Sequence, residues 1–92
     1  MTWVAVGLGA NLGDAAGTLR AAIDALACLP GTRLVRASRL YRTPAWGVTA
    51  QPDFINAVVS VDTDLPPLDL LRQLLAIQAR HGRVRSIPNA PR

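Results

Sequence analysis

The sequence predicts an α/β protein of the α+β class, with a ferredoxin-like β-α-β-β-α order in a single domain over residues 1–92. Three segments have the short apolar or alternating pattern of strands, and two have apolar residues three and four positions apart, as in helices. A chain of 92 residues that is 50% hydrophobic and 17% charged has the composition of one small globular domain. We therefore expect an antiparallel sheet with both helices on one face, incomplete at the C-terminus.

The first half of the chain is expected to hold a strand, a helix and an edge strand. Thr2–Leu8 is a short apolar run typical of a buried strand. From Asp14 onward the apolar residues follow helical spacing until Pro30 and Gly31 end the helix. Arg33–Tyr41 alternates imperfectly and is rich in Arg, which indicates an exposed edge strand, because charge on an edge deters pairing with other chains.

The second half is expected to hold a loop, a buried strand, a helix and a tail. The loop Thr43–Pro52 precedes Phe54–Val61, whose odd positions form an unbroken apolar face. A helix opens at Pro66-Pro67 and ends near Gly82, and Arg83–Arg92 is a basic tail without periodicity. The buried stripe of this helix is expected to consist of Leu70, Leu71, Leu74, Leu75 and Ile77.

Composition favours an anionic partner and a reducing compartment. The ten basic residues are all Arg and the six acidic residues all Asp, and the net charge is +4. A total absence of Lys and Glu indicates compositional bias, which weakens any argument from a single Arg. Cys28 is the only cysteine, excludes an internal disulfide, and is expected to be a small buried residue of the first helix. No apolar run reaches the length of a membrane span, so we expect a cytoplasmic protein without a membrane partner.

The glycine-rich stretch "VGLGANLGD" allows two interpretations. Gly7, Gly9 and Gly13 form G-x-G-x-x-x-G, one residue longer than the dinucleotide-binding fingerprint. The stretch does lie between a predicted strand and a predicted helix, as that fingerprint requires. The alternative is an ordinary strand-to-helix turn, in which glycine supplies conformations that other residues resist.

Phe54 and Asn56 form a candidate binding pair on the strand that is clearest in the sequence. Both lie on the parity opposite the packed face, so an aromatic ring and a carboxamide stand side by side on the open face. The ring offers a stacking surface and the amide offers donors and an acceptor to a planar nitrogen heterocycle. The alternative is that Phe54 packs under the loop and Asn56 caps a backbone group.

Two charged clusters also have a functional and a structural interpretation. Arg83, Arg85 and Arg92 follow the second helix, and their guanidinium groups could bind a polyphosphate or simply form a solvated basic end. Asp62 and Asp64 form a D-x-D that could hold Mg²⁺, but they directly precede Leu65-Pro66-Pro67, where Asp is ordinarily a turn or cap residue. His81 lacks a second ligand at metal-binding spacing.

Four blocks taken in order resemble one family: "VGLGANLGD", "SRLYRTPAWG", "QPDFINAVVSVDTDLPPLDLL" and "HGRVR". The chain resembles 6-hydroxymethyl-7,8-dihydropterin pyrophosphokinase, an enzyme of folate synthesis, from Val4 to Arg92. The resemblance implies transfer of pyrophosphate from ATP to the hydroxymethyl group of the pterin. It also implies that the glycine-rich stretch is the turn between strand and helix near the pterin, and not a phosphate cradle.

The resemblance implies a role for individual residues where the motifs match. Phe54 would stack on the pterin and Asn56 would bind its pyrimidinone edge, while Arg83, Arg85 and Arg92 would contact the phosphates, with Arg83 and Arg92 catalytic. Gln78 stands where the family often has a Glu that contacts the nucleotide, which makes that contact doubtful. The remaining pterin contacts would come from Thr43, Pro44 and Trp46.

The resemblance also implies that this chain is the N-terminal portion of the family's domain. In the family, a strand bearing a D-x-D follows the position of Arg92, and its carboxylates hold two Mg²⁺ ions. We therefore expect no metal ligand within these residues, no pyrophosphokinase activity from them alone, and self-association through an exposed first strand. The alternative function is a small basic RNA-binding module of the same fold, which would need several aromatic residues on the open strands; the strand Phe54–Val61 offers only Phe54.

Overall fold

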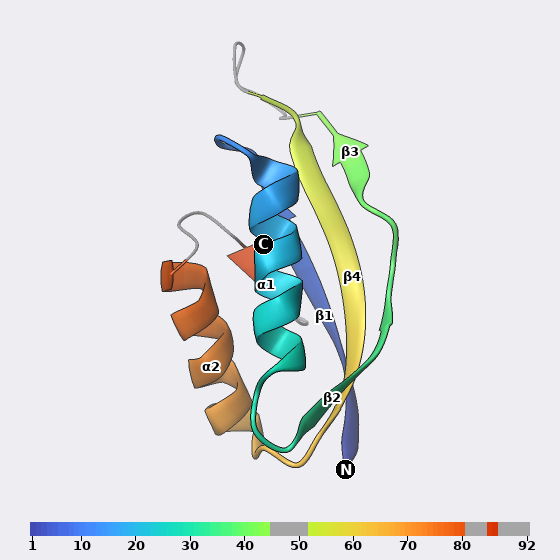
Figure 1. Cartoon of the computed structure of the whole chain (residues 1–92), viewed down its shortest axis with the longest axis vertical. Helices are drawn as coiled ribbons and strands as arrows, with labels where there is room; N and C mark the ends of the chain where they lie inside the picture. Colours follow the sequence, from blue (N-terminus) through green and yellow to red (C-terminus); the bar gives the residue numbers. More distant parts are fainter. Residues whose placement is uncertain (45–51, 81–84, 87–92) are drawn as a thin grey trace.

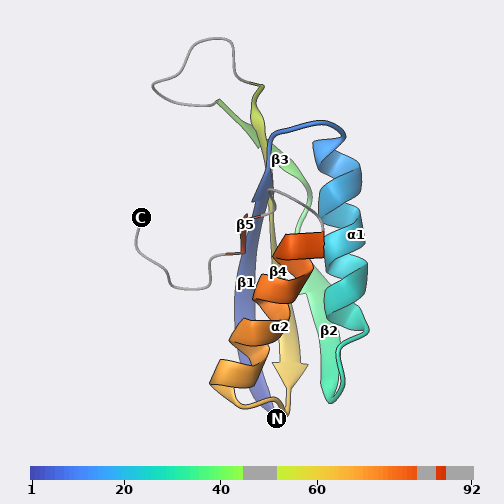
Figure 2. The same ribbon diagram turned by 90° about the vertical axis from the view of Figure 1, so that its left-hand side faces the viewer.

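The computed structural model describes residues 1–44, 52–80 and 85–86, which form an antiparallel sheet with two helices against one face (Figure 1 and Figure 2). The sheet order is β2-β4-β1-β5, and β3 pairs with β4 on the same side as β2. The predicted α+β fold is confirmed, including the antiparallel sheet. In chain order the elements are β1 (Thr2–Ala10), α1 (Ala15–Ala27), β2 (Thr32–Ala37), β3 (Tyr41–Thr43), β4 (Phe54–Thr63), α2 (Pro67–Arg80) and β5 (Arg85–Ser86).

Strand β4 is the central strand and separates the two faces of the sheet, as its alternation predicts. Ala57, Val59 and Val61 are buried under the helices, whereas the residues between them lie on the other face. Strand β1 pairs with β4 along its whole length, with Val6 opposite Val59 and Gly9 opposite Asn56. Because directly opposed residues face the same side, the helix face of β1 carries its own buried apolar residues. These are Val6, Leu8 and Ala10.

The predicted edge strand Arg33–Tyr41 is two strands in the structure. The register with β4 shifts between Leu34 and Arg36, and the Val58 amide donates to the hydroxyl of Ser38 (2.9 Å) rather than to a carbonyl. A side-chain oxygen therefore takes the place of a backbone acceptor, and the regular ladder stops there. The chain rejoins β4 at Tyr41, opposite Asn56.

Helix α1 begins where the sequence predicts. The Asp14 side chain caps it by accepting a hydrogen bond from the Gly17 amide (3.1 Å). Leu19, Ala22 and Leu26 form its buried stripe. Cys28, expected to be buried, is exposed, because it lies just past the last turn and outside that stripe.

Helix α2 buries only three of the five residues predicted for its stripe. Leu70, Leu74 and Ile77 are buried, but Leu71 is 44% exposed and Leu75 54% exposed. Each exposed residue follows a buried one and is therefore rotated by about 100° around the helix axis. Together with Leu68 (65% exposed), they form a second apolar stripe, which we call the outer stripe of α2.

The basic segment after α2 was expected to lack regular structure, but it contains β5. Arg85 and Ser86 pair with Gly9 and Leu8 at the edge of β1. The edge of β1 was expected to be open throughout, and β5 covers its far end. Residues 81–84 and 87–92, with the predicted cap Gly82, lie outside the described part of the chain.

Candidate functional site

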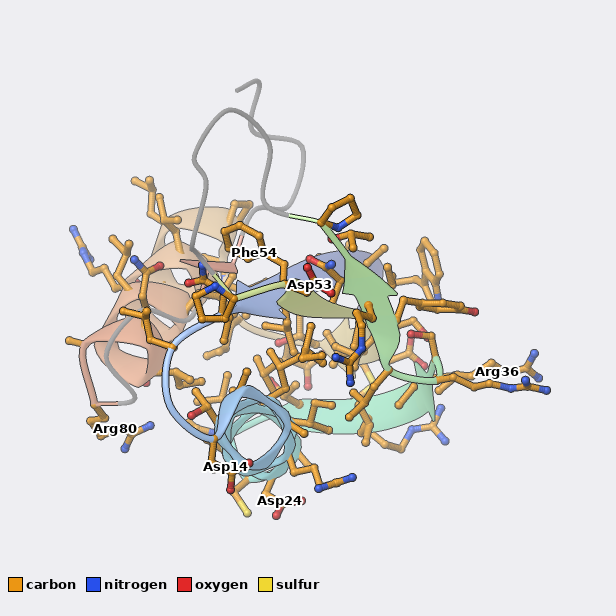
Figure 3. All side chains as sticks on the ribbon, turned by 90° about the horizontal axis from the view of Figure 1, so that it is seen from above. Asp14, Asp24, Arg36, Asp53, Phe54 and Arg80 are labelled. Carbon is orange, nitrogen blue, oxygen red and sulfur yellow. The ribbon has the colours of Figure 1, made fainter. Side chains whose placement is uncertain are left out.

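Phe54 and Asn56 lie on the face of the sheet away from the helices, as their parity predicts. Figure 3, a view from above, shows the Phe54 side chain across the sheet from α1. Both residues are half-buried, so each keeps surface that a ligand can contact. Their pairing partners on β3 are Thr43, opposite Phe54, and Tyr41, opposite Asn56.

The Asn56 carboxamide is held between β3 and β1. Its Nδ2 donates a hydrogen bond to the Thr43 hydroxyl at 2.7 Å. On the other side, a Cβ atom placed on Gly9 would lie 3.0 Å from Asn56 Oδ1, so any side chain larger than hydrogen at position 9 would press on the amide. The amide therefore has a defined orientation, with its nitrogen toward β3 and its oxygen toward β1.

The glycine-rich stretch divides between strand and turn. Gly7 and Gly9 belong to β1, and only Gly13, with φ +60°, lies in the turn that leads to α1. Gly7 lies within the strand expected over Thr2–Leu8, and the strand continues through Gly9, so of these three glycines only Gly13 supplies the turn. Gly9 instead provides room beside the Asn56 amide.

Asn11 is a residue whose position the sequence analysis missed. It is 7% exposed, and its Nδ2 donates to the carbonyl oxygen of Pro52 at 3.5 Å. This contact joins the turn after β1 to the segment that enters β4 at Phe54, across 41 residues of sequence. The signal in the sequence is an Asn between the glycines of "GANLG", and the structure adds that it is buried, where amides are normally hydrogen-bonded.

One row of directly opposed residues crosses the sheet at Asn56. Arg85 of β5 lies opposite Gly9 of β1, Gly9 opposite Asn56 of β4, and Asn56 opposite Tyr41 of β3. With neighbouring strands about 4.8 Å apart, the backbone of Arg85 is about 10 Å from that of Asn56. A basic residue predicted to contact phosphate thus shares an end of the sheet with the residue predicted to bind the heterocycle.

The other predicted site residues are only partly placed. Pro44 follows β3 directly, and Gln78 lies half-buried in the last turn of α2. Trp46, Arg83 and Arg92 lie outside the described residues.

Asp62 and Asp64 are both engaged by cations, so they do not converge as a metal site. The Asp62 carboxylate accepts from Arg33 at 2.9 Å, and Asp64 lies 3.5 Å from the N-terminal ammonium of Met1. Asp62 is also still part of β4, whereas a turn was expected. Residues 1–44, 52–80 and 85–86 contain no group of three or more His, Cys or Asp side chains that could hold a metal ion.

Besides Phe54 on β4, the open face carries exposed aromatic residues on β1 and β3. Trp3, opposite Asp62, is 62% exposed, and Tyr41 is 55% exposed.

Within the described part of the chain, neither helix has the length and hydropathy to cross a bilayer.

Comparison with known proteins gives one consistent family. The sequence model of 7,8-dihydro-6-hydroxymethylpterin-pyrophosphokinase matches residues 5–92. A relative from Methylorubrum extorquens, named 2-amino-4-hydroxy-6-hydroxymethyldihydropteridine pyrophosphokinase, is 49% identical over 92 residues, which are 100% of this chain and 58% of the relative. Proteins of the same name from Pseudomonas aeruginosa and Pseudomonas putida are 47% and 46% identical and align with 97% and 95% of this chain, covering 55% and 72% of their own lengths.

The chain thus spans a little over half the length of the first two relatives. Among solved structures, a dinuclear metal-binding peptidase of the M20 family from Bacillus subtilis superposes with a TM-score of 0.50 at 17% identity, over 97% of this chain and 26% of the peptidase. At this identity the likeness concerns the fold alone.

Proposed function

Because the chain belongs to the 7,8-dihydro-6-hydroxymethylpterin-pyrophosphokinase family, we propose that it carries the pterin-binding half of an ATP-dependent pyrophosphokinase of folate synthesis. The observation that supports this most directly is the oriented Asn56 amide beside Phe54 on the open face. The two ligands of the proposed enzyme are ATP and the hydroxymethyl pterin.

Phe54 and Asn56 divide the recognition of the pterin between them. The aromatic ring of Phe54 stacks on the flat bicyclic ring, and the Asn56 amide pairs with its polar edge. Thr43 and Pro44 border the same position from β3 and its end, and Trp46 supplies further apolar cover. Within the described residues, Asn56 Oδ1 accepts no hydrogen bond, so it is available to a ring N–H.

The phosphate side of the reaction falls to the basic segment after α2. The hydroxymethyl oxygen of the pterin attacks the β-phosphorus of ATP, the bond to the α-phosphate oxygen breaks, and AMP leaves. Arg83 and Arg92 neutralise the charge that develops on the transferring phosphates, Arg85 binds the nucleotide phosphates, and Gln78 lies near them on α2. The short row from Arg85 to Asn56 supports this arrangement, because it brings both substrates to one end of the sheet.

Such phosphoryl transfers use magnesium, but the described residues do not form a site that fits this ion. The Asp62 and Asp64 carboxylates already hold Arg33 and the N-terminal ammonium. We therefore place no metal ligand within these residues and no catalytic step on a metal here. The 92 residues by themselves are expected to bind pterin but not to transfer pyrophosphate.

Pterin binding is tested by fluorescence titration of 6-hydroxymethylpterin against the purified chain. Asn56→Ala is expected to weaken binding by about 1–3 kcal/mol, because the polar edge of the bound ring is left unpaired. Ser60→Ala is the matched control, because it removes a polar group from the same face of β4 but four residues further along the strand. It should leave the affinity unchanged. Equal affinity of wild type and Asn56→Ala would show that the pterin is not bound here.

Catalytic competence is tested by AMP release from ATP in the presence of the hydroxymethyl pterin and Mg²⁺. The 92-residue chain is expected to give no turnover above a no-enzyme blank, because several kcal/mol of metal-derived charge stabilisation are missing from the barrier. Turnover by this chain would contradict the proposal. A Methylorubrum extorquens relative of full length serves as the positive control.

Self-association is proposed as a further property of the chain as given. Val58 uses its amide and carbonyl groups toward Ser38, so Gly7, opposite Val58, directs its own backbone groups to the far edge of β1. The backbone groups of Trp3 and Ala5, which lie four and two residues before Gly7, point to the same edge. Among the described residues, β5 pairs only with Leu8 and Gly9. An uncharged edge of this kind is prone to pair with a second strand.

The alternative of an RNA-binding module receives less support. Trp3 and Tyr41 do add exposed aromatic surface to the open face, which such a module would need. The family match, however, favours the pyrophosphokinase.

We also propose a cytoplasmic location, on the ground that an unpaired, exposed thiol at Cys28 fits a reducing compartment.

A further inference from the structure

Asn11 lies at the point where the pairing of β1 with β4 ends. The last pair of this ladder is Ala10 opposite Ile55. Continued by one step, the same register sets Asn11 opposite Phe54, the first residue of β4. Figure 1 and Figure 2 show the turn before α1 and the start of β4 at the same end of the sheet. The residue proposed to stack on the pterin therefore lies at a strand end, just beyond the last backbone pair with β1.

The Asn11 side chain extends the connection past the end of this ladder. It is 7% exposed, and its Nδ2 donates a hydrogen bond to the carbonyl oxygen of Pro52 at 3.5 Å. Pro52 precedes Phe54 by two residues, and Ile55, which follows Phe54, is paired with β1. The chain on both sides of Phe54 is thus tied to β1 and its turn, on one side by the ladder and on the other by the Asn11 amide.

The position of a stacking ring is sensitive to such a tie. Strand ends open more easily than strand interiors, because fewer contacts hold them. Aromatic rings attract a second ring only at a limited range of offsets and tilts, so a small rotation of the backbone at Phe54 changes the stacking surface that a ligand meets. An amide that holds this backbone therefore influences stacking through the chain.

We propose that the Asn11 side chain is a positioning group, which holds the start of β4 so that the Phe54 ring keeps the orientation in which it stacks on the pterin. This inference rests on the proposed pterin site, but it assigns a separate role to a residue of the turn before α1. A carboxamide suits this role, because it donates a hydrogen bond to the Pro52 carbonyl without bringing a charge into a buried position.

The first measurement follows the Phe54 ring directly, because Phe54 is the only phenylalanine in the chain. Incorporation of fluorophenylalanine gives a single fluorine NMR resonance, whose chemical shift and width report the surroundings of this ring without any ligand. Asn11→Ala is expected to shift or broaden the resonance. Leu12→Ala is the matched control, since it truncates a 49% exposed side chain of the same turn, and it should leave the resonance unchanged. An unchanged resonance in Asn11→Ala would overturn the inference.

The second measurement is a double-mutant cycle on the affinity for 6-hydroxymethylpterin. Asn11→Ala is expected to weaken binding about fivefold in the wild-type chain, the effect of one net hydrogen bond. In the Phe54→Leu background the same change should weaken binding by less than about twofold, because leucine has no ring to orient. A merely structural role of Asn11 would give the same loss in both backgrounds, and that result would also overturn the inference.

A second variant and a separate test of the site complete the design. Asn11→Ser has a shorter polar side chain without the Nδ2 donor, is expected to give the same results, and replaces Asn11→Ala if urea denaturation shows that the alanine variant does not fold. If Asn56→Ala weakens pterin binding while the cycle is additive, the pterin proposal stands and the positioning role of Asn11 fails. If neither Asn56→Ala nor Phe54→Leu weakens binding, the pterin site is refuted and the positioning role is refuted with it.

Discussion

At the scale of single residues, buried hydroxyl and amide groups join segments that are distant in sequence. Thr63, at the end of β4, is 2% exposed and accepts from the Leu65 amide at 3.1 Å. Its hydroxyl also lies 2.7 Å from that of Thr32, and because Thr32 donates to the carbonyl of Pro30, Thr63 is the donor in this pair. Thr63 thus ties the start of β2 to the end of β4, as Asn11 ties the turn after β1 to the segment before Phe54.

The hydroxyl of Thr63 is predicted to contribute measurably to stability. Thr63→Val keeps the shape of the side chain but removes two hydrogen bonds and leaves the Leu65 amide without this acceptor. The free energy of unfolding, from urea denaturation, should fall by about 1–3 kcal/mol. Thr2→Val, the same change at an exposed strand end, is the control and should alter it by less than about 0.5 kcal/mol. Equal stability of the two variants would mean that the hydrogen bonds of the Thr63 hydroxyl do not stabilise the fold.

At the scale of elements, helix α1 shows why a glycine can be required inside a helix. Ala is the better helix former by about 1 kcal/mol, so Gly17 would ordinarily be a weak choice at this position. A Cβ on Gly17, however, would overlap with Oδ2 of the capping Asp14. A methyl group at position 17 therefore conflicts with the observed position of the capping carboxylate, and one of the two must shift.

This exclusion predicts a coupling between the two positions. Asp14→Ala should lower the free energy of unfolding by about 1 kcal/mol through loss of the cap. Gly17→Ala should bring no net gain in the wild-type background, because its methyl group displaces the capping carboxylate. In the Asp14→Ala background the same change should stabilise by up to about 1 kcal/mol. Additive effects in this double-mutant cycle would contradict the steric explanation.

At the scale of the whole molecule, two apolar features lie on the same side of the sheet. In Figure 1 and Figure 2, α2 begins at the end of the sheet where β1 begins, and it runs alongside that strand. The open edge of β1 and the outer stripe of α2 (Leu68, Leu71 and Leu75) therefore flank the same region. Exposed apolar surface of this kind is typical of an association surface.

Self-association is predicted to depend on this surface and not on exposed apolar residues in general. Light scattering coupled to size-exclusion chromatography should give a molar mass that rises with concentration for the 92-residue chain. Leu71→Lys should weaken the association about tenfold or more, because a leucine that would be buried becomes charged. Val35→Lys is the matched control, since Val35 and Leu71 are both 44% exposed and Val35 lies on the opposite edge strand. A monomer at all concentrations, or equal effects of the two lysines, would refute the prediction.

The sequence by itself determined the features that depend on local periodicity. The alternation in β4 decides which residues face the helices, and so it placed Phe54 and Asn56 together on the open face. The start of helical spacing at Asp14 and the break at Pro30 bracketed α1, which runs from Ala15 to Ala27, in the same local way. Parity and helical spacing follow from the geometry of the chain itself.

Only the tertiary structure decided which side chains meet across the strands. The break between β2 and β3 depends on the contact of Ser38 with Val58, and the exposure of Leu71 and Leu75 depends on how far α2 is covered. The Asn56 amide meets Thr43 and lies beside Gly9, and these two residues belong to two other strands. Such contacts join residues that are 13 and 47 positions from Asn56, and no local pattern records the register that brings them together, because many registers satisfy the same alternation.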